Sequence, residues 1–296
     1  MAEVRVLAFG GCNIRAPMVR AAHRRTLRDP APWEEVPRGY KLTGPPFFTY
    51  TLGEIDQALA CYRGEKTIPE ELLGLCNMRP QTAPTPARSP LGKIDVAILE
   101  PNTSIEILLD GVIINRRPVL QLLYPLRKLG PEATQLSTRW FEKGIAARDE
   151  EARAANAGEL IPVIPNDFPN RQLIVRVLSD AVGTKPPSLD GLRRLAETIG
   201  APIGVALFAW AYMPDGRPLS WPADFLREMI EAADGLGIPA FDPRPLVRAA
   251  GVETALAGDQ RHYADAFLPV VAKPLIEFTL ATAAGGPVPI PTSAAR

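Results

Sequence analysis

The sequence predicts an α/β protein with three layers, in which a mainly parallel, flavodoxin-like sheet is covered by helices on both faces. Short, continuous apolar runs such as EVRVLAF (3–9), KIDVAILEPNTS (93–104) and IGVALFAW (203–210) recur along the chain. Such runs are typical of strands buried on both faces. Segments with helical spacing lie between them, and this alternation favours a parallel sheet with helices on each side.

The first run ends at Gly10-Gly11, and we expect a helix over 16–27 with Pro17 near its start. A strand, a glycine turn and a helix open a doubly wound fold. Residues 28–92 are rich in proline and glycine and read as an insertion with one short helix at 51–64. This insertion is equally compatible with a lid over a site and with an inert loop.

The second half of the chain is expected to be mostly helical, with helices at 111–130, 134–160, 166–183 and 188–200. The last of these has Ser188 as a candidate N-cap, Gly200 at its end and an apolar stripe made of Leu189, Leu192, Leu195 and Ile199.

A further helix at 221–237 should follow the strand 203–210, and a short strand should end at Asp242-Pro243. The final helix begins at about 262 and shows one apolar face made of Phe267, Val270, Val271, Leu275 and Phe278. We predict one domain over 1–281, followed by a flexible tail at 282–296.

The charge balance indicates which partners to expect. Lysine plus arginine number 33 and aspartate plus glutamate also number 33, which predicts neither a nucleic-acid nor an anionic membrane partner. No apolar run reaches the roughly 18 residues of a membrane span, and the first residues carry no apolar signal-peptide core. The expectation is a cytoplasmic protein.

Cysteine and histidine are scarce, at three and two residues. These numbers predict no disulfide framework and no metal site, and we expect no cofactor. Cys12 stands out because it follows the first strand and its glycine turn. At a helix N-terminus the dipole and free N–H groups should lower the pKa of an exposed thiol and could hold an oxyanion. The alternative is a small buried hydrophobic side chain.

Asp259 and His262 lie three residues apart in AGDQRHYADAF (257–267), just before the last helix. An aspartate at this spacing can orient an imidazole that takes a proton from a nucleophile elsewhere in the chain. The alternative is a surface pair without a catalytic role.

In parallel sheets, ligands bind beyond the carboxyl ends of the strands. This rule places Cys12 on the same rim as residues 100–103, which follow another strand. Glu100 could act there as an acid or base or bind a substrate hydroxyl, or it could simply cap the turn that follows it or pair with an arginine.

Taken together, FGGCN (9–13), LEPNT (99–103) and DQRH (259–262) resemble, in order and position, the three sequence blocks of the SGNH (GDSL-type) hydrolase superfamily. Cysteine stands where serine is usual, as in the GSC-type and capsule-biosynthesis relatives of that superfamily, whose opening motif is similar and includes Arg15. The resemblance implies that Cys12 is the nucleophile, that His262 is its base and that Asp259 orients His262.

The same resemblance makes Asn102 an oxyanion donor, although Glu100, Pro101 and Thr103 depart from the Gly-x-Asn-Asp pattern of the middle block. The separate glycine block of the family has no counterpart that we can locate. Backbone N–H groups at Cys12 and Asn13 are therefore candidate donors, and Gly11 allows close approach of a substrate.

The resulting hypothesis is an esterase or acyltransferase that acts on a carbohydrate or small metabolite, with an acyl donor as a further small-molecule partner. A thioester on Cys12 would favour transfer to an acceptor other than water. One alternative is a non-catalytic binding module with the same fold. Another is a nucleotide-binding protein that uses GGCN as a phosphate cradle, although neither a Walker sequence nor GxGxxG is present.

Overall fold

The computed structural model describes residues 3–23, 31–44, 47–207, 220–259 and 262–286. Five expectations extend beyond these residues: the end of the helix at 16–27, parts of the insertion at 28–92, the end of the strand at 203–210, the middle of the block at 259–262, and most of the tail at 282–296.

The core is a parallel sheet formed by five strands within the described residues: β1 (Val4–Phe9), β2 (Tyr40–Thr43), β3 (Val96–Leu99), β7 (Ile203–Ala206) and β8 (Ala240–Phe241). Their order is β2-β1-β3-β7-β8, which is the 2-1-3-4-5 order of flavodoxin-like folds when these strands are counted alone. The predicted fold class is confirmed. The order reverses between β1 and β3, and this pair therefore forms the switch point at which such folds bind ligands.

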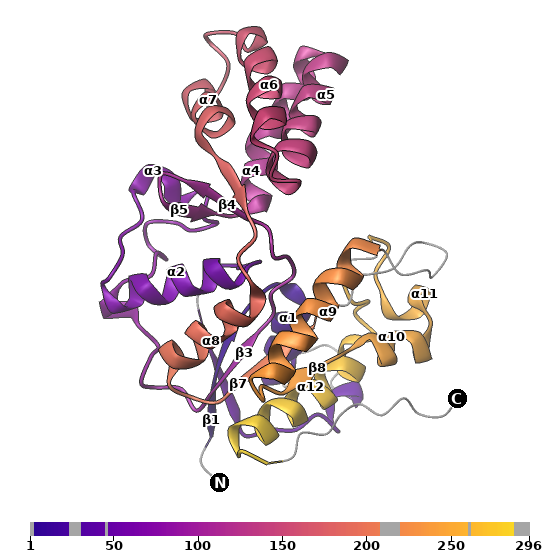
Figure 1. The fold of residues 1–296 in the computed structure, drawn as a ribbon. Helices are drawn as coiled ribbons and strands as arrows, with labels where there is room; N and C mark the ends of the chain where they lie inside the picture. Colours follow the sequence, from indigo (N-terminus) through magenta and orange to yellow (C-terminus); the bar gives the residue numbers. More distant parts are fainter. Residues whose placement is uncertain (1–2, 24–30, 45–46, 208–219, 260–261, 287–296) are drawn as a thin grey trace.

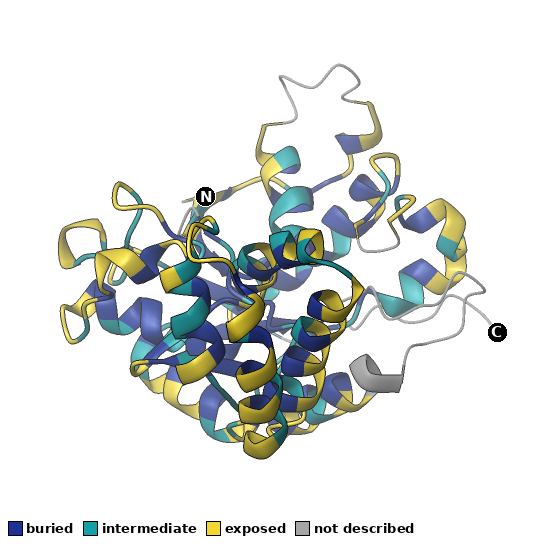
Figure 2. Ribbon diagram, turned by 90° about the horizontal axis from the view of Figure 1, so that it is seen from above, coloured by how far each residue is buried: buried dark blue, intermediate teal, exposed yellow. Residues whose placement is uncertain are grey.

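Alternate side chains of β1 enter the two layers that cover the sheet. Val6 and Ala8 pack with α1 (Cys12–Ala22), α10 (Arg244–Ala250), α11 (Val252–Ala255) and α12 (Leu268–Ala283). Leu7 and Phe9 pack with α2 (Leu52–Arg63), α8 (Ser188–Ile199) and α9 (Ser220–Gly235). Helices on both faces complete the three layers (Figure 1). Many of the helices show both buried and exposed residues, as Figure 2 shows from above.

A helical module, defined here as residues 105–185, stands above the main sheet (Figure 1). It contains a small antiparallel sheet with the order β5-β4-β6, made of β4 (Glu106–Leu109), β5 (Val112–Ile114) and β6 (Val182–Thr184). Its helices are α4 (Arg116–Leu123), α5 (Pro131–Arg139), α6 (Glu150–Leu160) and α7 (Arg171–Asp180), with a π-helical segment at Trp140–Ala146. Trp140 is fully buried and donates its indole N–H to the carbonyl of Leu178 at 3.0 Å, which ties this segment to α7.

The remaining helical segments are short: α3 (Glu70–Leu73) and 3₁₀ turns at Ala31–Trp33, Pro86–Arg88, Tyr124–Leu129 and Ile161–Val163.

Several sequence-based expectations for individual elements are wrong in detail. The helix expected at 111–130 begins as strand β5, and the one expected at 166–183 ends at Asp180 before strand β6. Both strands are three residues long, too short to show a strand period in the sequence. The proline-rich stretch contributes the helix α2, as expected, but also the edge strand β2. The boundaries of a single domain at 1–281 remain a prediction.

Two apolar stripes are narrower than expected, since Leu189 and Val270 are exposed. Ser188 is the first residue of α8 rather than its cap, and its hydroxyl donates a hydrogen bond to Glu228 at 2.7 Å. The last helix begins at Leu268, because the residues from His262 onward first form a bridge between Tyr263 and Leu256. In the described part of the chain, no helix is both long and apolar enough to cross a membrane.

Candidate active site

Cys12 is the first residue of α1, immediately after the turn that leaves β1. Gly10 has φ +149°, and a Cβ there would lie 2.4 Å from the Cβ of Glu100. Only glycine allows this approach between the ends of β1 and β3. The two strands are in register up to their last residues, Phe9 and Leu99, so the turn after β1 and the residues after β3 meet at the switch point.

Glu100 lies beneath this turn and is fully buried. Its Oε2 accepts hydrogen bonds from the backbone N–H groups of Gly11, at 2.9 Å, and of Ile14, at 3.3 Å. Glu100 therefore caps the start of α1 and not the turn that follows it, which was the capping role expected from the sequence. Burial raises the pKa of Glu100 to about 8, although these two N–H groups and the Asn13 side chain act against the rise.

The pKa of the half-buried Cys12 thiol is raised, chiefly by burial and then by the negative charge of Glu100. Arg117 and Arg15 act in the opposite direction, and Asp259 adds a smaller rise. The fall in pKa was expected for an exposed thiol, and this thiol is half-buried. Loss of water and a nearby carboxyl outweigh the two arginines.

Arg15 comes from the second turn of α1 and lies against residues of the proline-rich segment. Its guanidinium carbon is 5.7 Å from the centre of the Phe48 ring, and its Nη1 donates to the carbonyl of Phe47 at 3.4 Å. Burial lowers the pKa of Arg15. The segment expected as a possible lid therefore contacts the residues around Cys12.

Tyr50 and Arg117 are part of this environment and were missed by the sequence-based prediction. The Tyr50 hydroxyl is hydrogen-bonded to the side chain of Arg117, and burial raises the pKa of Tyr50. Arg117 lies in the first turn of α4, where the side chain of Asn115 accepts its backbone N–H at 3.0 Å. No motif links either residue to Cys12, because Tyr50 belongs to the proline-rich segment and Arg117 to the helical module, and only folding brings them together.

Asn102, the candidate oxyanion donor, lies after β3 on the same rim. Its backbone N–H donates to the carbonyl of Tyr50 at 2.9 Å, and the N–H of Thr103 donates to the same carbonyl at 3.2 Å. Asn13 is buried in the first turn of α1. The backbone N–H groups of Gly11 and Ile14 donate hydrogen bonds to Glu100. The N–H groups of Cys12 and Asn13 lie between these two in the sequence, at the positive end of the helix dipole.

Asp259 and His262 form a direct pair. The Oδ2 atom of Asp259 lies 2.5 Å from Nδ1 of His262, and Oδ1 accepts the backbone N–H of His262 at 3.1 Å. About half of each side chain is exposed to solvent. Across the described residues, no hydrogen bond joins the His262 ring to the Cys12 thiol.

The neighbour of His262 anchors this loop in the core. Tyr263 is buried, and its pKa is raised well above the usual value by burial and by the charges of Glu100 and Asp242. Tyr263 is thus close enough to Glu100, the carboxyl that caps the Cys12 turn, for the Glu100 charge to act on its hydroxyl. The first and last sequence blocks, and the residue after β3, share one end of the sheet.

The other cysteines and the second histidine have different surroundings. Cys61 and Cys76 are buried, whereas Cys12 is partly exposed. His23 is exposed near the end of α1, with its ring against the carbonyl of Val19 at 3.0 Å. Within the described ranges, no group of three or more histidine, cysteine, aspartate or glutamate side chains could hold a metal ion.

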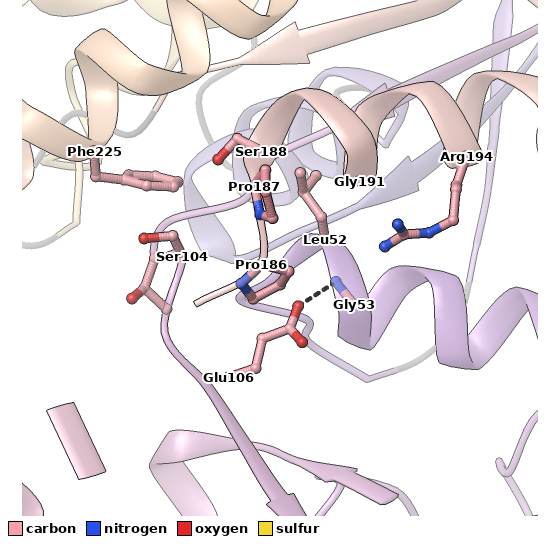
Figure 3. Close-up of a pocket in the computed structure, with 11 residues that line it drawn as sticks. Leu52, Gly53, Ser104, Glu106, Pro186, Pro187, Ser188, Gly191, Arg194 and Phe225 are labelled. Carbon is pink, nitrogen blue, oxygen red and sulfur yellow. Dashed lines mark hydrogen bonds between the residues drawn. The ribbon is translucent and has the colours of Figure 1, made fainter. Parts of the chain in front are cut away.

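A separate small cavity of about 10 Å³ lies between α2, α8 and the start of the helical module. There Glu106 accepts the backbone N–H of Gly53 at 2.9 Å, and Arg194 points toward the same hollow (Figure 3). This is about the smallest volume that can hold one water molecule. Cys12 does not line it.

The fold and the site together define a three-layer α/β/α protein with a cysteine at the switch point of a parallel sheet. Residues 4–278 match the family described as the TviD N-terminal domain, and the chain belongs to this family. No curated protein and no solved structure matches the chain.

Proposed function

We propose that the protein is an acyl-transfer enzyme, an esterase or acyltransferase acting on a carbohydrate or small metabolite. The observation that carries this proposal is the 2.5 Å contact between Asp259 and Nδ1 of His262, in a loop whose aspartate acts electrostatically on the Cys12 thiol. Asp259 is nearly 250 residues from Cys12 in the sequence. Folding nevertheless brings the two close enough for the charge of Asp259 to act on the thiol. The resemblance to SGNH hydrolases supports the same assignment.

In the proposed reaction, Asp259 holds Nδ1 of His262, which leaves Nε2 to accept the proton of the Cys12 thiol. The sulfur attacks the carbonyl carbon of the acyl donor, and the N–H groups of Cys12 and Asn13 stabilise the oxyanion. His262 returns the proton to the leaving group as the thioester forms. An acceptor hydroxyl, or water, then attacks the thioester while His262 takes its proton, and the thiol is regenerated.

The raised pKa of Cys12 is consistent with a nucleophile that needs a base during the reaction. A thiol at rest requires proton removal at the moment of attack, whereas a preformed thiolate would not. His262 therefore has to approach the thiol when substrate binds. Hydrogen bonds between a catalytic base and its nucleophile are often long before substrate is present and shorten in the reactive complex.

A second candidate function is a non-catalytic binding module. The absence of a thiol–imidazole hydrogen bond between Cys12 and His262 in the described structure favours it. So does the middle block, in which Glu100 and Pro101 replace the family residues and Glu100 acts as a helix cap.

Acylation by p-nitrophenyl acetate separates the two functions. The acyl-transfer proposal expects one acetyl group on Cys12, detected by intact mass and peptide mapping, with loss of this adduct in Cys12→Ala. His262→Ala should slow acetylation by about 10²-fold or more, the usual contribution of a general base. His23→Ala, which changes the other histidine, should react at the wild-type rate.

Equal acetylation rates in His262→Ala and His23→Ala would exclude His262 as the base. Slow, equal modification of Cys12, Cys61 and Cys76 would favour the binding module.

A further inference from the structure

Glu100 has no assigned part in the proposed reaction, yet its carboxyl is hydrogen-bonded directly to the Cys12 turn. A Cβ placed on Gly11 would lie 3.6 Å from its Oε2 and 3.8 Å from its Oε1. Helix α1 begins at a glycine cap that has no side chain to accept N–H groups. Glu100, from the neighbouring strand end, takes over this function with Oε2.

The two oxygens of this carboxyl differ. Oε2 has two N–H donors, whereas Oε1 is completely buried and has no hydrogen-bond partner. An ionised carboxylate would leave part of its negative charge on an unpartnered oxygen away from water, which is costly. A neutral carboxylic acid reduces this cost, because no charge is buried, with the proton on Oε1 and both N–H groups still donating to Oε2. The pKa of about 8 agrees with that state at neutral pH.

The protonation state of Glu100 matters because its charge acts on the Cys12 sulfur. The other groups that act on this sulfur are Arg117 and Arg15, which favour the thiolate, and Asp259, which disfavours it. Tyr263, from the loop after His262, is a titratable residue on which the charges of Glu100 and Asp242 act, and it stays protonated because burial raises its pKa. Among the negative charges, that of Glu100 has the larger effect on the thiol.

We propose that Glu100 is the positioning residue of the Cys12 turn and works as a neutral carboxylic acid, so that a negative charge on Glu100 keeps the thiol protonated. The neutral acid holds the N–H groups of Gly11 and Ile14 and leaves those of Cys12 and Asn13 for an oxyanion. Its ionisation under alkaline conditions opposes thiolate formation. The proposal rests on the proposed function only where it concerns catalysis. The reactivity of the thiol itself can be measured without a substrate.

The test is the pH dependence of alkylation of Cys12 by iodoacetamide, followed by peptide mass spectrometry on the full chain. In Glu100→Gln, the amide oxygen can still accept both N–H groups, but the side chain cannot ionise. We expect the thiol of this variant to titrate at lower pH, with alkylation at mildly alkaline pH faster by about three- to tenfold. Glu106→Gln is the matched control, because Glu106 is also buried and also caps a helix start, at Gly53 of α2. It should follow the wild-type profile.

Identical alkylation profiles for Glu100→Gln and the wild type would overturn the proposal, while leaving acyl transfer by Cys12 open. Conversely, failure of the acetylation experiment would leave an altered profile in Glu100→Gln fully interpretable.

A second measurement needs no variant at Glu100. In protein with ¹³C-labelled glutamate carboxyls, NMR should show Glu54 and Glu100 still protonated at neutral pH, since burial raises the pKa of both to about 8. Glu54→Gln should remove one of these signals. Loss of both signals in that variant would show that Glu100 is ionised and would contradict the proposal.

Discussion

Asp259 contacts His262 twice, through its Oδ2 atom at Nδ1 of the ring and through its Oδ1 atom at the backbone N–H. The double contact fixes both the ring orientation and the start of the loop that carries it. Because Nδ1 is engaged, Nε2 is the ring atom left for chemistry. This pair is half exposed, so its contribution to stability should be about 1 kcal/mol or less.

Asp259→Asn should therefore reduce acetylation of Cys12 strongly while leaving the unfolding midpoint almost unchanged. We expect the acetylation rate to fall by at least about tenfold, because the amide no longer holds the imidazole in the required tautomer. Asp265→Asn is the control, since Asp265 is an exposed carboxylate nearby in the sequence that pairs with Arg20. A wild-type acetylation rate in Asp259→Asn would show that the Asp259–His262 pair takes no part in the reaction.

Arg117→Ala should raise the pKa of the Cys12 thiol further, because Arg117 is the positive charge with the larger effect on it. Less thiolate at mildly alkaline pH should slow alkylation by roughly two- to fivefold, and added salt should shrink the difference. Arg116→Ala is the control, since the Arg116 guanidinium lies 4.8 Å from the centre of the Phe141 ring instead. Equal slowing in both variants would point to a disturbed α4 rather than to charge.

Gly10→Ala should destabilise the protein by about 2–5 kcal/mol, through backbone strain and a steric clash. The residue has φ +149°, and the added methyl would lie 2.4 Å from the Cβ of Glu100. Gly158→Ala, in the exposed part of α6 with no atom within 4 Å of the new methyl, should instead stabilise by up to about 1 kcal/mol. Urea unfolding of the two variants measures this contrast, and similar midpoints would mean that β1 and β3 are less closely packed at the Cys12 turn.

Glu54 predicts a specific pH dependence of stability. It is buried, accepts hydrogen bonds from the Tyr50 backbone and the Asn115 side chain at 2.8 Å each, and has a pKa raised by burial to about 8. Between its unfolded pKa of 4.5 and about 8, the folded state holds a proton that the unfolded state releases. The free energy of unfolding should therefore fall as pH rises through this window, by at most about 1.4 kcal/mol per pH unit from this group.

Glu54→Gln should flatten this decline, so that the stability of the variant relative to the wild type improves as pH increases toward 8. Glu132→Gln, at an exposed position in α5, should leave the slope unchanged. Urea unfolding at several pH values between about 5 and 8 is the measurement. Parallel pH curves for Glu54→Gln and the wild type would show that Glu54 is ionised in the folded protein.

The sequence predicted β1, β3, β7 and β8 of the main sheet, and the first three are continuous apolar runs, but it did not predict the edge strand β2. It placed Cys12 and Glu100 on one rim by a general rule about parallel strands. Apolar runs and the turns that end them can be predicted from the sequence, because strand burial and turn conformation depend on a few neighbouring residues.

The helical module was harder to anticipate. The strand β5, at Val112–Ile114, pairs with β4 across a tight turn, while β6 returns from about 70 positions later to complete the small sheet. Each strand is stabilised by its partner rather than by its own residues, so neither β5 nor β6 could be distinguished from the helices beside it.

By itself, the sequence determined the fold class, the turn that presents Cys12 and the local Asp259–His262 pair, because each depends on near neighbours or on a short periodic pattern. Tertiary structure decided the electrostatics around the thiol. Tyr50 and Arg117 reach it from other elements, and the burial of Glu100 raises both its own pKa and that of Cys12. Desolvation and long-range charge depend on what packs around a group, and no local pattern in the chain encodes them.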